Sequence, residues 1–237
     1  MDPHVSGGWV SRTDDAAGLL AAHYYNMATG QDASIDSNGG NDSLSGVSGT
    51  VLYNHQNTSG NFAIYDYNTG SGNPPAALDP QPNAFVLSPA IGGDPGAWDD
   101  FTVNPTYPQI MVEDLATQTL TDLSNDPTTA NIQPAVSPDG SVVVRAKCDP
   151  SGTPGNIWEA TRGSGRTWNI SPLTTGSDDS EQPPTDGNIV VYQCLRAGRG
   201  RLAQPRPPPA QQHRHPANQH QPLNQAGGSA RWRCHLN

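Results

Sequence analysis

Three pairs of adjacent aspartates are the residues whose type and spacing could most directly do chemistry in this sequence. They lie in or beside expected inter-strand loops and comprise Asp14, Asp15, Asp99, Asp100, Asp178 and Asp179. Gathered at one end of a fold, these pairs would form an acidic rim that binds cations or a basic partner. The alternative is that they are surface charge that keeps the chain soluble.

A second acidic stretch, "DSNGGNDS" at 36–43, offers hard oxygen ligands from Asp36, Asn38 and Asp42. Its spacing departs from that of an EF-hand loop, and no bidentate glutamate follows. We therefore expect a surface turn with at most weak affinity for Ca²⁺, and we assign no cofactor and no metal ligand.

Two glutamates and two histidines are the remaining candidates for chemistry. Glu113 and Glu159 each follow an apolar pair in an expected strand, and they could serve glycoside or uronide chemistry if both faced one cleft. Strand alternation more simply places them on a wet face. His23 and His55 are expected to be satisfied or surface histidines, because no cysteine lies at metal-ligand spacing from either. The sequence has no nucleophile elbow, phosphate-binding loop or His-Glu-x-x-His motif, so no catalytic residue is assigned.

The elements that would position these residues repeat along the chain. A proline or serine, a short gap and then a glycine before an apolar run recur five times, with the glycines at 7, 49, 93, 140 and 187. About 20 residues after four of these glycines comes a short strand that ends in a turn, as in "HYYNMATG" (23–30), "AIYDYNTG" (63–70), "IMVEDLATQ" (110–118) and "NIWEATRGSG" (156–165). A period of 42 to 47 residues with several strands per unit indicates radial repetition of small sheets.

The turn residues of the fourth and fifth units carry a family resemblance. The blade turn motif comprises Pro134, Ser137, Pro138, Asp139 and Gly140, with Asp186, Gly187, Gly49 and Gly93 at matching positions. Together with "NIW" at 156–158 and "DGNIVVYQ" at 186–193, it resembles the WD40-like PD40 repeats of TolB-type β-propellers over residues 3–193. The resemblance implies an all-β propeller of four-stranded antiparallel blades. Four complete units and the start of a fifth predict an incomplete ring, whose two open blade faces would be apolar and available for self-association.

Charge divides the chain into two parts. Residues 1–193, the predicted propeller, carry five basic and 22 acidic residues, a net charge of −17, which makes nucleic acid an improbable partner. Residues 194–237 carry seven arginines and no acid, with "RPPP" at 206–209 and "HRHPANQH" at 213–220. This basic, Pro/Gln/His-rich tail is either a disordered segment, an interaction tail or the product of a frameshift. Three widely spaced cysteines indicate free thiols, and no run of residues is apolar enough to span a membrane.

The function that follows from the resemblance is a non-catalytic scaffold that binds a protein or a polysaccharide. The resemblance also implies a bacterial, periplasmic or extracellular setting, although no signal peptide precedes the repeats, so a cytoplasmic location stays open. Two alternatives remain. The chain could be the accessory or catalytic propeller of a secreted hydrolase or polysaccharide lyase, or a fragment of a larger surface repeat protein.

Overall fold

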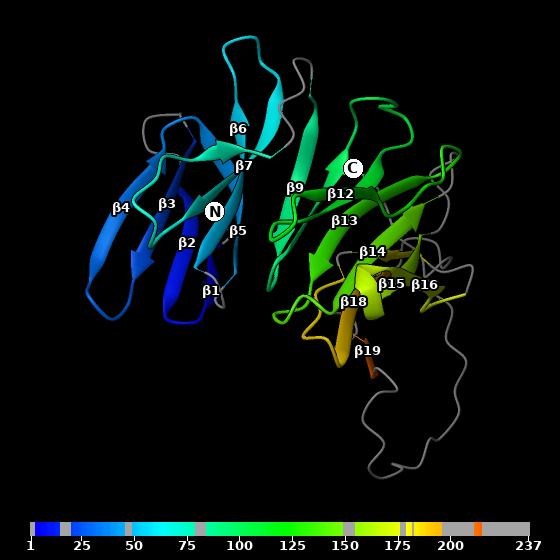
Figure 1. Ribbon diagram of the computed structural model, residues 1–237. Helices are drawn as coiled ribbons and strands as arrows, with labels where there is room; N and C mark the ends of the chain where they lie inside the picture. The colour runs from blue at the N-terminus through cyan, green and yellow to red at the C-terminus, as the bar shows by residue number, and fades with distance from the viewer. Residues whose placement is uncertain are drawn as a thin grey trace, which may run out of the picture.

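A computed structural model describes residues 3–14, 20–45, 49–78, 84–148, 155–175, 179–181, 183–195 and 211–214. These residues form antiparallel strands joined by tight turns, with a short 3-10 turn at Ser164–Arg166. The strands group into five sheets that follow one another along the chain, from blue to orange in Figure 1.

Four of the sheets are four-stranded blades whose strands are neighbours in chain order. The first blade contains β1 (His4–Ser6), β2 (Trp9–Asp14), β3 (Ala21–Asn26) and β4 (Gln31–Asp36), and the second contains β5 (Gly39–Ser45), β6 (Thr50–Gln56), β7 (Phe62–Asn68) and β8 (Ala76–Ala77). The third contains β9 (Val86–Ile91), β10 (Pro95–Asp100), β11 (Gln109–Asp114) and β12 (Thr119–Asp122), and the fourth contains β13 (Ala130–Val136), β14 (Val142–Cys148), β15 (Asn156–Arg162) and β16 (Trp168–Pro172). The fifth sheet contains β17 (Asp179–Glu181), β18 (Ile189–Leu195) and β19 (Gln211–Arg214).

The first strand of each blade lies innermost and packs across the preceding blade. β5 contacts β1, β2 and β3, then β9 contacts β5, β6 and β7, and β13 contacts β9, β10 and β11. This radial stacking is the architecture of a β-propeller. The prediction of an all-β propeller with four complete four-stranded blades and part of a fifth is therefore confirmed.

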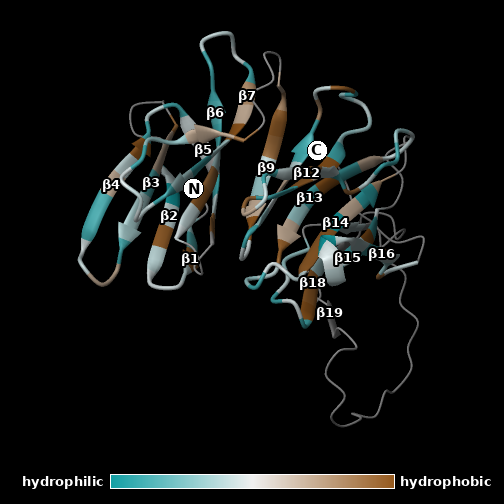
Figure 2. Cartoon of the chain, viewed as in Figure 1, coloured by the Kyte–Doolittle hydropathy of each residue, from teal (hydrophilic) through white to brown (hydrophobic). Residues whose placement is uncertain are grey.

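The hydrophobic core is divided into clusters between successive blades. Leu52 of the second blade packs with Trp98 of the third, Ala97 of the third packs with Val143 of the fourth, and Val144 of the fourth packs with Tyr192 of β18. Figure 2 shows the hydrophobic residues along strands such as β9 and β18, and hydrophilic residues in the outer strand β4. Because each blade buries one face against each neighbour, no blade can be stable alone.

The repeated glycines form the turn between the first and second strands of every sheet. Gly7, Gly49, Gly93, Gly140 and Gly187 all have positive φ, between 57° and 95°. Glycine adopts this conformation at little cost, whereas other residues are strained. We call the end of the blades that carries these turns the turn face, and the opposite end the loop face.

The Ser-Pro-Asp-Gly turn of the fourth blade is held by its own side chains. The Ser137 hydroxyl donates to Asp139 Oδ1 (2.6 Å), which also accepts the backbone N–H of Ser141 (3.0 Å), while the Val142 N–H donates to Ser137 Oγ (2.9 Å). This turn also abuts the preceding blade, because a Cβ added to Gly92 would lie 1.9 Å from the Ser137 carbonyl oxygen. The turn sequence therefore serves both the hairpin and the contact between blades.

In the fifth sheet, the matching aspartate plays a simpler role. Asp186 Oδ1 accepts the backbone N–H groups of Asn188 (2.8 Å) and of Ile189 (2.7 Å), the first residue of β18. Of the predicted tail, Gln211–Arg214 form β19 and pair with β18, and the tail residues 196–210 and 215–237 lie outside the described residues. No helix in the described part of the chain is long and apolar enough to cross a membrane.

The outward face of the first blade differs from the apolar surface expected of an open arc. Strand pairing places Val5, Val10, Arg12, His23 and Asp32 on this face. Val5 is exposed, but Arg12 donates two hydrogen bonds to the Asp32 carboxylate (3.1 and 2.9 Å). The expectation of a wholly apolar open face is therefore wrong for the first blade, because an ion pair crosses its centre.

Candidate functional site

A groove opens between the outer strands of the third and fourth blades, toward the turn face. Threonines from β12 and the turn before it form one wall, and Trp168 of β16 with two arginines forms the other. We call this surface the inter-blade groove. Its lining residues are Pro95, Val112, Asp114, Thr117, Thr119, Thr121, Arg162, Gly165, Arg166 and Trp168.

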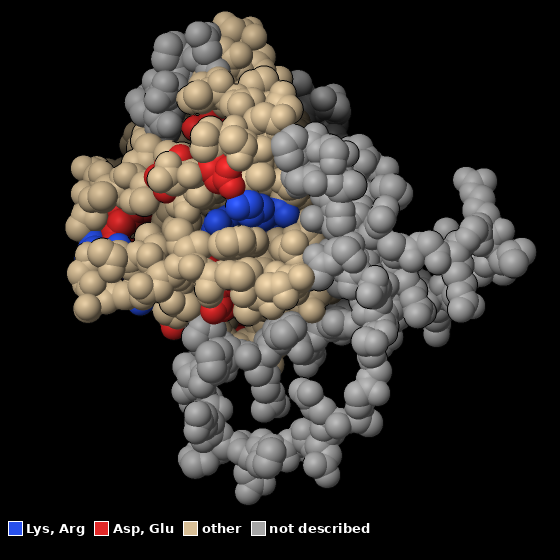
Figure 3. All heavy atoms as spheres, turned by 90° about the vertical axis from the view of Figure 1, so that its right-hand side faces the viewer, with Lys and Arg blue, Asp and Glu red and all other residues tan. Residues whose placement is uncertain are grey.

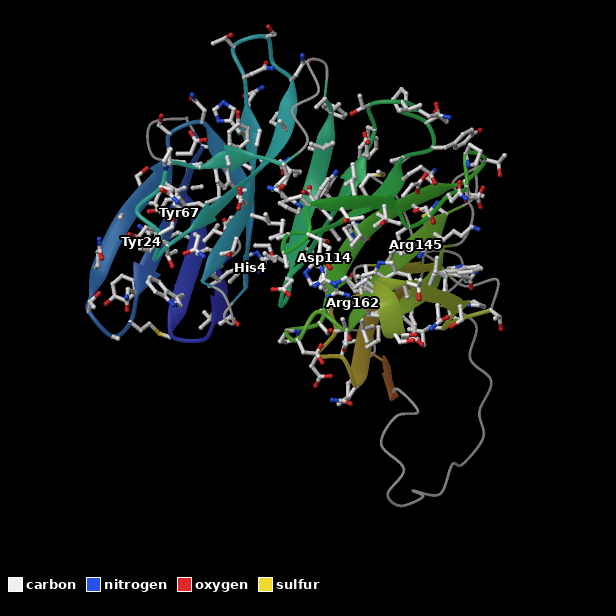
Figure 4. All side chains as sticks on the ribbon, in the orientation of Figure 1. His4, Tyr24, Tyr67, Asp114, Arg145 and Arg162 are labelled. Atoms are coloured by element: carbon white, nitrogen blue, oxygen red, sulfur yellow. The ribbon has the colours of Figure 1, made fainter. Side chains whose placement is uncertain are left out.

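A carboxylate shared by two guanidinium groups is the main charged feature of the groove. Asp114, at the end of β11, accepts hydrogen bonds from Arg162 Nη2 and from Arg166 Nη1, the second at 2.7 Å. Figure 4 shows Asp114 and Arg162 next to each other where the third and fourth blades meet. The contact joins residues 48 and 52 positions apart in the chain, so it depends on the packing of the two blades.

Asp114 occupies this position because it also caps a turn. Its Oδ1 accepts the backbone N–H groups of Ala116 and Thr117, both at 3.1 Å. Asn26 and Asn68 make the same kind of turn at the ends of β3 and β7. The third blade therefore has a carboxylate where the first two have a neutral amide, and the difference creates the ion pairs.

The arginines keep hydrogen-bonding capacity beyond Asp114. The guanidinium of Arg162 lies 5.9 Å from the centroid of the Trp168 ring, and the side chain of Arg166 is 48% exposed. Within the described residues, the side chain of each arginine donates to no acceptor other than Asp114. Two cations that share one anion leave a net positive charge, and a guanidinium is suited to bidentate contact with a carboxylate.

The predicted acidic rim is realised only in part. Asp14 ends β2, Asp100 ends β10 and Asp179 begins β17, so the topology places all three at the loop face. Asp15 and Asp178 lie outside the described residues. Asp99 is buried and is not part of any rim, because strand alternation points it to the opposite side from Asp100.

Asp99 instead links two inner strands. Its Oδ1 accepts the backbone N–H of Gln133 (2.9 Å), which has φ of +57° at an irregularity in β13. Burial raises the pKa of Asp99 to about 8, against the opposing effect of hydrogen bonds from Ser88 and Gln133. The carboxyl group is therefore mostly protonated at neutral pH, and its role is in the packing of the third blade on the fourth.

A second basic cluster lies between the same two blades, and the sequence analysis did not single it out. Arg145 of β14 is only 2% exposed, donates from Nε to Asn131 (3.0 Å) and lies over the Trp158 ring at 5.7 Å. Burial lowers the pKa of Arg145 to about 10. Lys147 lies over the same ring at 4.7 Å and pairs with Asp126 at 2.7 Å. Figure 3 views the molecule from the right-hand side of Figure 1 and shows Lys and Arg atoms next to Asp and Glu atoms near the middle of that side.

The candidate calcium ligands have other partners. Asp36 Oδ2 lies 2.6 Å from His55 Nδ1, and Asp42 accepts a hydrogen bond from Thr13 Oγ1 at 2.7 Å. Asn38 donates its backbone N–H to Asp36 (2.9 Å) as part of the turn. In the ranges that the structure describes, no group of three or more His, Cys, Asp or Glu residues could hold a metal ion.

Strand alternation predicted that the two glutamates lie on a solvent-exposed face, and this prediction is wrong. Glu113 is 6% exposed and Glu159 is 8% exposed. They also fail to share a cleft. Val112 packs toward the fourth blade, and Glu113 lies on the opposite face of β11. Glu159 pairs with Val144 in the neighbouring strand and shares its face, which packs toward β18. This separation removes the geometry that paired carboxylate catalysis needs.

The fold matches those of solved β-propellers. TolB from Acinetobacter baumannii aligns with a TM-score of 0.57 and 18% identity, covering 84% of this chain and 49% of that one. A putative TolB from Agrobacterium tumefaciens aligns with a TM-score of 0.56 and 18% identity, covering 80% and 68%. A puromycin hydrolase aligns with a TM-score of 0.57 and 15% identity, covering 81% and 35%.

These likenesses establish the fold. The chain spans about half the length of the Acinetobacter TolB chain and about a third of the puromycin hydrolase. No protein-family description matches the sequence. No curated protein matches it either.

Proposed function

We propose that this chain is a non-catalytic propeller scaffold that binds a protein partner in the inter-blade groove. The observation that carries the proposal is the shared contact of Arg162 and Arg166 with Asp114 on the wall of an open groove. Maintaining two guanidinium groups on one carboxylate contributes little to stability when one of them is half exposed. The two guanidinium groups are better explained as hydrogen-bond donors to an anion of a binding partner.

A protein partner fits the charge of the chain better than an anionic polysaccharide does. Residues 1–193 carry a net charge of −17, which repels a polymer with many carboxylates. A folded protein or a peptide can present one acid to the groove within an otherwise neutral or basic surface. The TolB-like fold also supports our proposal of a periplasmic or secreted location.

The proposal can be tested by site-specific photo-crosslinking. A photoreactive amino acid at Thr121, in the groove, should give discrete protein adducts in an extract of the source cells. The same probe at Val103 should give none of those adducts, because this residue is 93% exposed and lies in the loop between β10 and β11, at the loop face and not at the turn face toward which the groove opens. Identical adduct patterns from both positions, or no adduct from Thr121, would contradict a binding role for the groove.

The second candidate function is the propeller of a larger hydrolase. It is favoured by the likeness to the puromycin hydrolase, of which this chain covers only 35%. Nucleotide sequencing across codons 180–240 and several hundred bases beyond would decide between the two functions. Further repeat units followed by a hydrolase motif would favour the enzyme, and a stop codon after Asn237 would favour the scaffold.

A further inference from the structure

We infer that the inter-blade groove takes an extended peptide that pairs with β12 and presents one carboxylate to Arg166 and Arg162. The inference rests on the proposed binding function and specifies the chemistry of the partner. It combines two features of the same place in the fold, an unpaired strand edge and a pair of arginines beside it.

The first feature is the free edge of β12. Among the strands that the structure describes, β12 is the outermost of its sheet and pairs only with β11. The Leu123 N–H donates to the Ile110 carbonyl (2.8 Å), and hydrogen-bonded pairs alternate along an antiparallel ladder. Thr121 and Thr119 therefore direct their backbone groups to β11, whereas the N–H and C=O groups of Leu120 and Asp122 point away from the sheet.

The other outer strands of the four blades are less suited to pairing. β8 has only two residues, and β16 ends in Pro172, which lacks an N–H group. β4 carries Asp32 and Asp36, and charges on an edge strand discourage added strands. β12 has four exposed residues with no proline, and its single acid lies at its end. Its edge is therefore the most open to strand addition.

The second feature is the side-chain alternation along β12. Thr119 pairs with Asp114, and Thr121 pairs with Val112, so both threonines face the groove. Residues directly opposite in neighbouring antiparallel strands project from the same face of the sheet. A peptide residue opposite Thr119 or Thr121 would therefore project toward Arg166, Arg162 and Trp168. A glutamate or aspartate there would meet the guanidinium groups that Asp114 only partly neutralises.

The selection of random nine-residue peptides displayed on phage, using the full chain as bait, tests this inference. We expect enriched peptides with one Asp or Glu among alternating β-branched residues. Replacing that acid by its amide in a synthetic copy should weaken binding at least about tenfold, because a charge-assisted contact is lost. Enriched peptides without an acid, or no enrichment at all, would overturn the inference.

Two variants of the chain separate the contributions of side chain and backbone. Arg166→Gln should weaken the acidic peptide at least about tenfold and leave its amide copy unchanged, whereas the control Arg12→Gln should change neither. Leu120→Pro removes an N–H that points out of the sheet, so the blade should fold while peptide binding is lost. The control Leu120→Ala should bind normally. Equal binding by Leu120→Pro and Leu120→Ala would exclude strand addition.

The outcomes also distinguish this inference from the proposed function. If photo-crosslinking at Thr121 gives adducts but the peptides show no preference for an acid, the groove binds a partner by other contacts and only the inference fails. If neither experiment gives a signal at the groove, both the proposed function and this inference fail.

Discussion

The first two blades meet through aromatic rings. The Tyr24 ring of the first blade lies 5.8 Å from that of Trp9 in the same blade and 5.8 Å from that of Tyr67 in the second. Figure 4 shows Tyr24 and Tyr67 close together between the blades. Polar groups also meet at this interface: Thr13 Oγ1 donates to the Asp42 carboxylate at 2.7 Å, and Asp36 Oδ2 lies 2.6 Å from His55 Nδ1.

The third and fourth blades meet through charged groups as well as through apolar residues. Arg145 is buried there, and Asp114 holds two arginines at the turn face. Apolar residues such as Ala97 and Val143 still form the core of this contact. The same backbone repeat thus supports two different interfaces.

The difference indicates that stability alone does not explain the charges. Burying charged groups costs desolvation energy, and apolar replacements of similar size are often at least as stable. The aromatic interface shows that this fold can join two blades without arginine. The two arginines on Asp114 are therefore consistent with the binding role that we propose for the inter-blade groove.

The largest effect is expected from the pH dependence of Asp99. Its pKa is about 8 in the folded protein and about 4 in the unfolded chain, so unfolding releases a proton between these pH values. The contribution of Asp99 to stability is therefore present at low pH and is lost as pH rises through 8. Asp99→Asn should become progressively more stable than the native chain, by at most about 1.4 kcal/mol per pH unit.

Urea unfolding of both proteins from pH 5 to pH 9 measures this difference. Asp100→Asn, which changes the neighbouring acid on the other side of β10, is the matched control. A constant stability difference between Asp99→Asn and the native chain would show that Asp99 is ionised in the folded protein.

Breaking the aromatic interface should have the next largest effect. Tyr24→Ala removes a ring that is 6% exposed and in contact with two others, and we expect a loss of about 3 to 5 kcal/mol in the free energy of unfolding. Tyr24→Phe, which keeps the ring, should lose much less. Urea denaturation compares the two, and similar losses would show that the hydroxyl group matters more than ring packing.

Breaking the charged contact at Asp114 should cost less. Asp114→Ala removes both the turn cap and the partner of the arginines, for a loss of about 1 to 3 kcal/mol. Asp114→Asn installs the amide that caps the same turn in the first two blades, so it should lose only about 1 kcal/mol. Equal losses in urea denaturation would mean that the ion pairs, and not the cap, dominate.

The smallest effect is expected for the ion pair on the outward face of the first blade. The side chains of Arg12 and Asp32 are 30% and 47% exposed, so water screens their attraction. Asp32→Asn should change the free energy of unfolding by less than about 1 kcal/mol, and less still in 0.5 M salt. A larger loss in the free energy of unfolding, with or without the added salt, would indicate that this face packs against another surface in solution.

The repeat in the sequence predicts most of the fold because turn chemistry is local. A glycine with positive φ closes the first hairpin of each sheet, so the five glycines locate those hairpins in the chain. Asp99 and Asp100 were grouped because they are adjacent in the sequence. The two-residue period of a strand separates them, and this rule could have assigned Asp99 to the interior.

The contact of Asp114 with Arg162 and Arg166 could not be predicted from local pattern, because it depends on how two blades pack. One signal was present in the sequence. The third strands of the first three blades end in Asn26, Asn68 and Asp114, and a carboxylate among amides at one repeat position marks a unit with an additional role. Arg145 gave no such signal, because a basic residue within a strand pattern usually indicates a solvent-facing position.

Hydrogen–deuterium exchange of the full chain, with and without a selected acidic peptide, tests the central claim most directly. If the peptide adds to β12, the amides of Leu120 and Asp122 should exchange more slowly in the complex, while those of the outer strand β4 should be unchanged. Slower exchange confined to the loop face, or no change in β12 under saturating peptide, would contradict the assignment of the inter-blade groove as the binding surface.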